Sequence, residues 1–376
     1  MLIGIDGNEA NIKNRVGVNV YAFELLRNIY KLQGEWENRF QFVIYLSSPP
    51  LFDMPKETSV WKYRVISGGS FWIVRKLMLN LLISQPRPQV FFSPFHYVPP
   101  LALMPRVCSI MDLGYLENSG QFKLRDFWQL KYWSAWSIFV SKYIIAISNT
   151  TKDDIMRHYR FAKNKTFVTK LAYDKNEFSD KILLKEIKRV KRKHTTGDSY
   201  ILFLSTLKPS KNVLGLVRVW SLIEKKYPKV NLVIAGKKGW LFEEIFEEVK
   251  RLGIDKRVVF TDFIPEKDKP GLIGGAKVFI LPSFWEGFGL DVLNAMACGV
   301  VVVLSNIGSL PEVGGEAGVY INPNDDKDIA KGISRVLSMN KKEYNKWAMK
   351  GLRQAGQFSW EKTARETLAI FGNFMK

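Results

Sequence analysis

The part of the chain richest in chemistry is residues 282–299, where one acid, Glu286, is followed by two glycines, Gly287 and Gly289. Glycine lets the backbone turn tightly and approach a ligand closely. A helix is expected to begin near Leu290, and the first N–H groups of a helix, with the positive end of its dipole, favour a bound anion. The pattern predicts a phosphate cradle with one carboxylate at its edge.

The elements that would position this cradle are short apolar runs. Because the runs are apolar on both faces, they predict strands buried in parallel sheets. Stretches of helical period separate many of them, which predicts βαβ units and an α/β fold of doubly wound sheets. Ligands bind beyond the carboxyl ends of such strands, and the predicted cradle follows one of them. The runs are residues 2–5, 42–46, 90–92, 107–110, 143–147, 201–204, 230–234, 258–260, 278–281 and 300–304.

The chain length of 376 residues most simply accommodates two domains. A Lys-rich segment without a strand, residues 181–194, precedes a turn-like segment and a fresh strand. We therefore predict domains over residues 1–178 and 199–357, joined by a linker over residues 179–198. Apolar residues on the other face of this segment favour a solvated linker helix over a nucleic-acid patch for the basic run 188–193.

The composition narrows the class of protein. A net charge of +20 indicates an anionic partner: nucleotide phosphates, anionic lipid headgroups or nucleic acid. Cys108 and Cys298 lack the spacing of a metal site or disulfide framework. The first residues lack the pattern of a signal peptide, and no apolar run approaches the ~20 residues that span a bilayer. We expect a cytoplasmic protein.

Nine segments, one of them within the cradle, carry a likeness to a known family. On these residues the chain resembles, over nearly its full length, the family 4 (group 1) glycosyltransferases of the GT-B fold. The resemblance implies two facing Rossmann-like domains with parallel sheets and a C-terminal helix, residues 358–376, that crosses back to the first domain. The segments are residues 17–21, 93–97, 112–113, 147–148, 207–212, 236–240, 286–290, 310–313 and 358–360.

The resemblance also implies an activity. A hexosyltransferase of this family moves a hexose from a nucleotide diphosphate sugar to a hydroxyl of a glycan or lipid-linked glycan, as in polysaccharide biosynthesis. Either GDP-mannose or a UDP-sugar is expected as the donor, with GDP-mannose favoured. The anomeric configuration would be retained, with no metal and no cofactor besides the donor.

By the same resemblance, Glu286 and Lys211 are the expected catalytic residues. Glu286 would bind hydroxyls of the donor sugar. Lys211 would contact the pyrophosphate, where a point charge suits the growing negative charge. His96 is expected on the acceptor side. The expected donor-binding residues are Gly17, Asp112, Thr206, Ser210, Phe263, Gly287, Phe288, Gly289, Leu290 and Asn294.

Several of these positions have plainer interpretations. Glu286 also suits a cap of the following helix, and Lys211 a surface lysine. Asp112 fits a structural role and a catalytic one equally. For His96, inside an aromatic triplet, packing is favoured over a role as a base.

Three positions depart from the family pattern. Asn294 stands where a glutamate usually meets the ribose, Met111 where a histidine precedes Asp112, and Ser210 where an arginine is common. The departures suggest an alternative, a nucleotide-sugar-binding protein with weak or no turnover. A second alternative, a nucleic-acid-binding protein, is suggested by the positive charge and the basic run 188–193, but the sequence has no recognisable nucleic-acid-reading module.

Two stretches combine aromatic and basic residues: residues 61–64 with 71–76, and residues 122–133. Such segments can lie on an anionic bilayer, with rings at the headgroup level and cations against phosphates. They fit equally well as core aromatics beside solvated bases. A peripheral location on the inner face of the plasma membrane therefore stays open.

Overall fold

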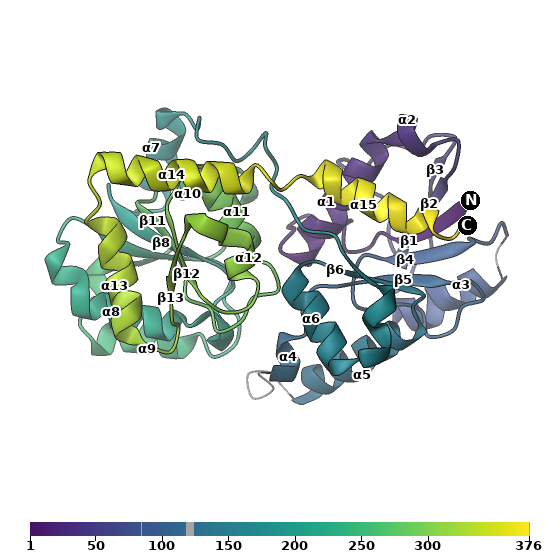
Figure 1. Ribbon diagram of the computed structural model, residues 1–376, viewed down its shortest axis with the longest axis horizontal. Helices are drawn as coiled ribbons and strands as arrows, with labels where there is room; N and C mark the ends of the chain where they lie inside the picture. Colours follow the sequence, from purple (N-terminus) through teal and green to yellow (C-terminus); the bar gives the residue numbers. More distant parts are fainter. Residues whose placement is uncertain (84, 118–123, 376) are drawn as a thin grey trace. The chain divides into compact units, whose positions relative to one another are not determined.

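The computed structural model describes residues 1–83, 85–117 and 124–375. The chain forms two compact units, Met1–Leu171 with Ser359–Lys376, and Ala172–Phe358 (Figure 1). Each unit holds one parallel sheet covered by helices, so the predicted α/β fold class is confirmed. No helix of the described residues is long and apolar enough to cross a membrane.

The sheet of the first unit has seven parallel strands in the order β3-β2-β1-β4-β5-β6-β7. The order reverses beside β1, which is the switch point where doubly wound sheets bind ligands. The strands are β1 Leu2–Asp6, β2 Gln41–Leu46, β3 Trp61–Val65, β4 Val90–Ser93, β5 Arg106–Ile110, β6 Tyr143–Ala146 and β7 Thr166–Val168.

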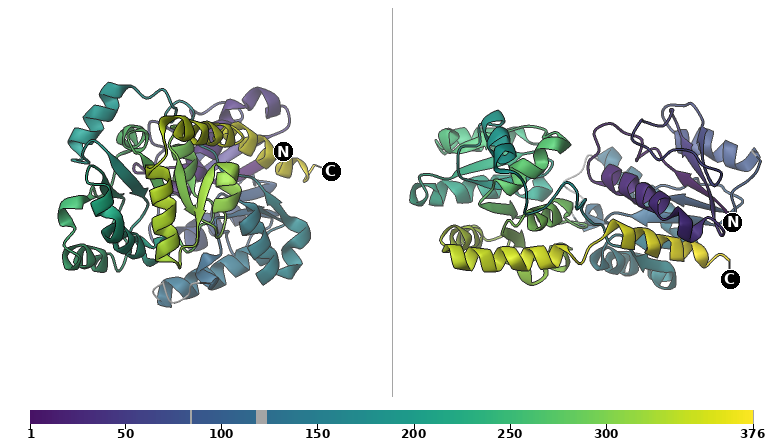
Figure 2. Two further views of the ribbon diagram at one scale, coloured as in Figure 1. Left: turned by 60° about the vertical axis from the view of Figure 1, so that its left-hand side comes forward. Right: turned by 90° about the horizontal axis from the view of Figure 1, so that it is seen from above.

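Helices cover both faces of this sheet. On one face, α1 and α15 pack side by side, and Phe371 of α15 contacts Phe42 of β2 and Phe92 of β4 (Figure 2). The helical elements are α1 Val18–Lys31, α2 Gln33–Trp36, η1 Ile73–Leu77, α3 Met78–Ile83, α4 Gly114–Glu117, α5 Leu124–Val140, α6 Asn149–His158, η3 Arg160–Lys165 and α15 Trp360–Gly372.

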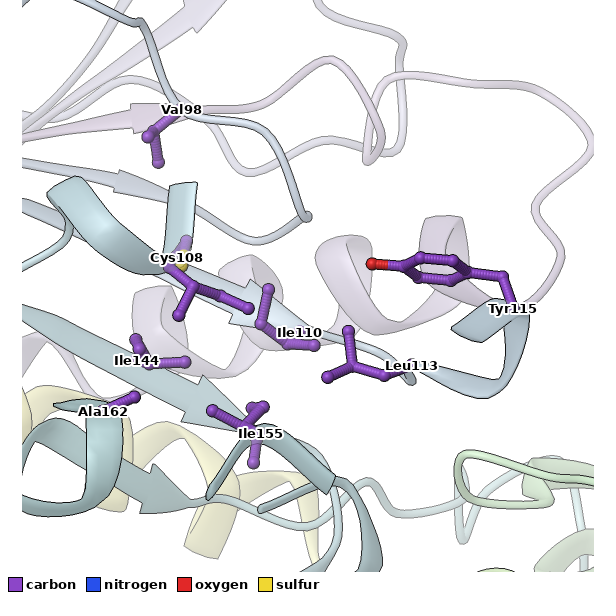
Figure 3. Close-up of a cluster of buried hydrophobic side chains, with 10 residues drawn as sticks. Val98, Cys108, Ile110, Leu113, Tyr115, Ile144, Ile155 and Ala162 are labelled. Atoms are coloured by element: carbon purple, nitrogen blue, oxygen red, sulfur yellow. The ribbon is translucent and has the colours of Figure 1, made fainter. Parts of the chain in front are cut away.

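Strand register shows what covers the opposite face. Phe91 points away from its neighbour Phe92 and packs with Leu81 of α3. Cys108 of β5 pairs with Ser93, which shares the side of Phe91. Cys108 belongs to the core cluster drawn in Figure 3. Ile138 of α5 is a member of the same cluster. Helices α3 and α5 therefore lie on the same face of the sheet.

The sheet of the second unit has six parallel strands in the order β10-β9-β8-β11-β12-β13. Its strands are β8 Tyr200–Leu204, β9 Asn231–Ala235, β10 Val258–Phe260, β11 Val278–Leu281, β12 Val302–Ser305 and β13 Gly318–Ile321. Its helical elements are α7 Leu184–Lys193, η4 Pro209–Lys211, α8 Val213–Ile223, η5 Glu224–Lys226, α9 Glu243–Arg251, η6 Asp255–Arg257, η7 Glu266–Asp268, α10 Lys269–Gly274, α11 Leu290–Ala297, α12 Leu310–Gly314, η8 Gly315–Ala317, α13 Asp326–Leu337 and α14 Lys341–Ala355.

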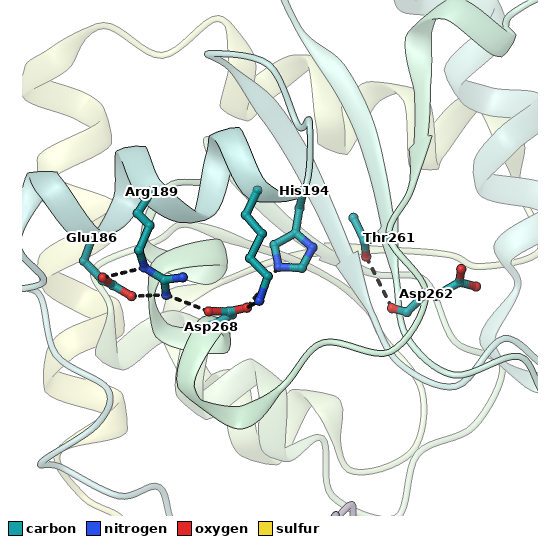
Figure 4. A network of polar contacts seen from close by, with 7 residues as sticks. Glu186, Arg189, His194, Thr261, Asp262 and Asp268 are labelled. Carbon is teal, nitrogen blue, oxygen red and sulfur yellow. Dashed lines mark hydrogen bonds and ion pairs between the residues drawn. The ribbon is translucent and has the colours of Figure 1, made fainter.

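Residues 179–198, expected as a linker, lie within the second unit, where α7 packs against α10. Asp268 is fully buried and accepts from Arg189 at 2.6 Å and Lys193 at 2.5 Å, with His194 at 3.2 Å (Figure 4). Burial alone would raise the pKa of Asp268, but these hydrogen bonds outweigh it and hold the pKa well below its usual range. This network attaches α7 to the second unit, which explains why residues 179–198 are part of that unit and not a separate linker.

Candidate functional site

The loops that follow β8 and β11, two adjacent strands at the centre of the second sheet, bring Lys211 and Glu286 together. Lys211 Nζ donates to Glu286 Oε1 at 2.5 Å, and each side chain is only 11% exposed. Lys211 is therefore not a surface lysine. The two predicted catalytic residues form one ion pair beyond the carboxyl ends of their strands.

Neighbouring groups fix Glu286 from two sides. Ser283 Oγ donates to the same carboxylate oxygen, Oε1, at 2.8 Å. The Glu286 carbonyl accepts from both the backbone N–H and the hydroxyl of Ser309. A Cβ on Gly308 would lie 2.9 Å from that carbonyl oxygen, so the close approach of the chain after β12 requires glycine there.

The interpretation of Glu286 as a helix cap is wrong. Helix α11 begins at Leu290, its N-cap is Gly289, and no side chain of the described residues caps it. Gly289 has φ 95°, a left-handed conformation that favours glycine. The predicted turn and the predicted start of the helix are thus both present. Gly287, which directly follows Glu286 and precedes this turn, is buried.

Lys211 is held by a short helical turn, η4. Ser210 in this turn is buried, and its carbonyl accepts from the backbone N–H of Phe284 at 2.9 Å. This bond joins the loop after β8 to the loop that carries Glu286. Asn212 adopts a left-handed conformation and its Nδ2 donates to the Pro323 carbonyl at 2.8 Å, which fixes the start of α8.

Asn294 lies on the buried side of α11, where it contacts a carboxylate that the sequence interpretation overlooked. Its Nδ2 donates to Asp291 Oδ1 at 3.1 Å, and Asn294 is 5% exposed. Burial raises the pKa of Asp291, and the charge of Glu286 adds to this rise. The charge of Lys269 and the hydrogen bond from Asn294 oppose it. The spacing of three residues on one helix is the signal that could have revealed this pair.

The other expected donor-side residues of the second unit differ in setting. Phe288 is 3% exposed and packs edge-on against Phe358 at 5.9 Å, so its side chain belongs to the core. Thr206 follows β8, and its methyl group would lie 3.2 Å from a Cβ on Gly239. Phe263 follows β10 and is partly buried. The roles of Thr206 and Phe263 toward a donor stay predictions.

Gly17, Asp112 and His96 belong to the first unit. Gly17 is the exposed N-cap of α1 with φ 51°, so its backbone conformation, and not packing, favours glycine. Asp112 Oδ1 accepts from the Gly114 N–H at 3.0 Å, a turn contact. The roles of Gly17 and Asp112 toward a donor, and that of His96 on the acceptor side, also stay predictions.

His96 is a packed histidine. It is 6% exposed and contacts the ring of Phe95 edge-on at 4.9 Å. Burial lowers its pKa to about 4, although the charge of Asp112 opposes the shift. Its ring is therefore neutral near pH 7, and its Nδ1 has no hydrogen-bond partner.

Over residues 1–83, 85–117 and 124–375, no group of three or more His, Cys, Asp or Glu side chains is placed to hold a metal ion.

Comparisons of the sequence with known proteins point to one family. Residues 185–354 match the family model described as glycosyl transferases group 1. The chain is 32% identical over 239 residues to O-antigen chain mannosyltransferase B of Escherichia coli, which covers 61% of this chain and 60% of that protein. It is 31% identical over 235 residues to the serotype-specific mannosyltransferase WbdA of Escherichia coli, covering 61% of this chain and 28% of WbdA. These matches span three fifths or less of the relatives' length.

Comparisons of the structure cover nearly the whole chain. Anabaena Alr3699/HepE, in complex with UDP and glucose, superposes with a TM-score of 0.72 and 18% identity over 99% of both chains. A glycosyltransferase from Rickettsia africae superposes with a TM-score of 0.74 and 16% identity, covering 100% of this chain and 98% of that one. At such identities the likeness concerns the fold alone, and it confirms the predicted GT-B class.

Proposed function

Because residues 185–354 match the model of the group 1 glycosyl transferases, the family that the sequence predicted, we propose that this chain transfers a hexose from a nucleotide diphosphate sugar to a hydroxyl of a glycan or lipid-linked glycan. The observation that carries the proposal is the Lys211–Glu286 ion pair beyond the carboxyl ends of β8 and β11. An enzyme acting on a lipid-linked acceptor would work in the cytoplasm at the membrane surface.

We propose mannose as the sugar and GDP-mannose as the favoured donor, with a UDP-sugar as the other candidate. Two relatives at 31–32% identity are named mannosyltransferases, one of them for the O-antigen chain, which supports a mannosyl donor and a polysaccharide acceptor. The structural relative from Anabaena holds UDP and glucose, which supports a nucleotide sugar as the donor class.

In this proposal the two halves of the ion pair separate when the donor binds. The ammonium group of Lys211 exchanges Glu286 for the pyrophosphate and stabilises the charge that grows as the glycosidic bond breaks. Glu286, still held by Ser283, then accepts from hydroxyls of the sugar. The backbone of residues 287–290 and the start of α11 present N–H groups to the phosphates.

We propose retention of configuration without a protein nucleophile. The leaving phosphate would take the proton of the acceptor hydroxyl on the same face of the sugar from which it departs. Lys211 would then neutralise the phosphate, a role that needs its positive charge within a partly dry site.

The experiment is a thermal-shift and transfer assay of the purified chain with GDP, UDP and their sugars. A nucleotide at 100 times its dissociation constant stabilises the protein by about 2.7 kcal/mol. Lys211→Met should abolish this shift, whereas Lys225→Met, an exposed lysine of the same unit, should leave it unchanged. If Lys211→Met binds nucleotide as tightly as the parent chain, the proposed site is wrong.

A second candidate function, binding of a nucleotide sugar with weak or no turnover, rests on Ser210 and Asn294. Asn294 is engaged by Asp291, so it meets a ribose with only part of its hydrogen-bonding capacity. Tight binding of a nucleotide sugar, without hydrolysis or transfer over hours, would favour this candidate. The nucleic-acid alternative is weakened, because Arg189 and Lys193 of the basic run are committed to buried Asp268.

A further inference from the structure

Helix α5 of the first unit presents four large aromatic side chains outward. Trp128, Tyr132, Trp136 and Phe139 recur at spacings of four, four and three residues, which places them on one face of the helix. They are between 42% and 65% exposed. Phe161 of η3 continues this face: it is 55% exposed and its ring contacts that of Phe139 at 5.8 Å.

The side of α5 that packs on the sheet is, in contrast, partly polar. Ser134 and Ser137 are fully buried there, beside Ile138. A helix folded only for its own unit would bury its aromatic rings and expose its serines. The outward aromatic row is therefore not explained by packing within this unit.

Cations surround the aromatic row. Lys131 lies over the ring of Trp128 at 4.9 Å, and Lys165 lies over that of Phe161 at 5.1 Å. Lys142, Arg160 and Lys163 are exposed nearby in the chain. Over residues 127–165, Lys and Arg outnumber Asp and Glu by seven to two.

The same side of the sheet carries more exposed apolar residues. Leu79 and Ile83 of α3, which shares the face of α5, are 52% and 76% exposed. Leu101 and Leu103, in the segment joining β4 to β5, are also exposed. The exposed basic residues Arg75 and Lys76 precede α3, so this second group repeats the combination of apolar and cationic side chains.

We propose that this face of the first unit, defined by the aromatic row of α5 with Phe161 and its flanking cations, docks on an anionic lipid bilayer. Trp and Tyr rings favour the headgroup level, and Lys and Arg extend to lipid phosphates while their stems cover apolar surface. The core of a protein interface is instead depleted of lysine, and two copies of so basic a face would repel each other. Charge thus selects the bilayer as the occupant.

The two aromatic-basic stretches of the sequence differ in how far their aromatic rings are exposed. Trp61 and Trp72 are buried, so in residues 61–64 and 71–76 the tryptophans belong to the core. In the stretch 122–133, residues 122–123 lie outside the described residues, and the exposed rings begin at Trp128. The row then extends beyond that stretch, to Phe139.

The test is flotation of the full chain with vesicles of phosphatidylcholine alone or with about 30% phosphatidylglycerol. Each cation near an anionic surface strengthens binding by about fivefold, so we expect anionic vesicles to be bound at least about tenfold more strongly at low salt. Binding should weaken as ionic strength rises past the point where the Debye length is about 8 Å.

Variants separate this face from the rest of the basic surface. Tyr132→Gln/Phe139→Gln/Phe161→Gln changes the three most exposed rings of the row, and we expect it to lose at least about tenfold in vesicle binding. Lys142→Glu/Lys163→Glu should lose the preference for anionic lipid. Leu184→Gln/Leu222→Gln, two exposed apolar residues of the second unit, is the matched control and should bind as the parent does. Circular dichroism and thermal unfolding report whether each variant is folded.

No vesicle binding by the parent, or equal loss in the control, would overturn the proposal. A concentration-dependent dimer that the ring variant abolishes, seen by analytical ultracentrifugation without lipid, would also overturn it and identify a self-association surface. The assay contains no nucleotide sugar, so its failure leaves the proposed transfer activity untouched.

Discussion

Replacing Asn294 by glutamate tests the side-chain pair in the first turns of α11. From the sequence, this change is expected to tighten nucleotide binding by roughly threefold to thirtyfold, since it restores a charged acceptor for the ribose. The structure adds a cost in stability that the sequence did not reveal. Asn294 Nδ2 donates to Asp291 Oδ1 at 3.1 Å, and an ionised glutamate has no hydrogen to donate. Asn294→Glu would place two carboxylates side by side.

The size of the effect follows from charge and burial. Two like charges about 4 Å apart repel by about 4 kcal/mol at an effective dielectric constant of about 20. The lost hydrogen bond to a charged group adds about 1.5 to 3 kcal/mol. Lys269 offsets part of the repulsion and of the lost hydrogen-bond energy, because its positive charge stabilises the ionised Asp291. We expect Asn294→Glu to lower the free energy of unfolding by about 3 kcal/mol near neutral pH.

The loss should depend on pH. Burial already raises the pKa of Asp291, and a second carboxylate would raise it further, above the value of about 3.9 in the unfolded chain. Between these two values the folded state binds more protons than the unfolded state, so the free energy of unfolding falls as pH rises. The deficit of Asn294→Glu relative to the parent should therefore shrink toward about pH 4 to 5.

The difference in the free energy of unfolding is measured by urea unfolding of the parent chain and of Asn294→Glu, near neutral pH and near pH 5. The matched control is Asp291→Asn/Asn294→Glu, which keeps a single carboxylate and should recover most of the lost stability. The reasoning is refuted if Asn294→Glu is as stable as the parent near neutral pH. It is refuted equally if the double variant is no more stable than Asn294→Glu.

Three further predictions follow from single side chains. Glu286→Gln should keep nucleotide binding but slow transfer by about one to three orders of magnitude, because a contact to the reacting sugar weakens; unchanged turnover would remove its role. Asp268→Asn should lower the free energy of unfolding by about 1 to 2 kcal/mol, since its cationic partners are about two-fifths exposed, whereas Asp262→Asn, at an exposed ion pair, should cost little by the same urea titration. The low pKa of Asp268 means that its contribution is present above about pH 4 and lost below it. His96 has a pKa of about 4 against about 6.5 when unfolded, so its contribution is full above pH 6.5 and lost as pH falls toward 4; His96→Gln should flatten the stability profile in that window, and an unchanged slope would contradict this.

All ten apolar runs in the sequence form strands. They were recognisable because of where these strands lie in the two sheets. They lie in the interior of the two sheets, apart from β10 at one edge, and burial on both faces leaves a continuous apolar signal. The strands that the sequence did not reveal, β3, β7 and β13, are all at sheet edges. In β3, the charged residues Lys62 and Arg64 interrupt the apolar run, so the pattern resembles a loop.

The candidate site was predictable only in part. Lys211 and Glu286 were identified by resemblance, but 75 residues separate them along the chain and their ion pair depends on the adjacency of β8 and β11. The resemblance assigned a role to Asn294 but none to Asp291, so the sequence did not single out this carboxylate. Their hydrogen bond follows from helical spacing, and it adds a cost in stability to the expected effect of a substitution.

Aromatic composition alone could not separate core from surface. Trp61 and Trp128 lie in stretches of similar composition, yet Trp61 is fully buried and Trp128 is 44% exposed. Helical spacing groups Trp128, Tyr132 and Phe139 on one side of α5, and that grouping is visible in the sequence. The sequence does not show which side of α5 meets the sheet. In the structure, β5 and β6 pack against the other side of the helix, which includes the buried residues Ser134, Ser137 and Ile138. A row for which the sequence left bilayer contact and core packing equally open is thereby turned outward, where the proposed anionic bilayer would cover it.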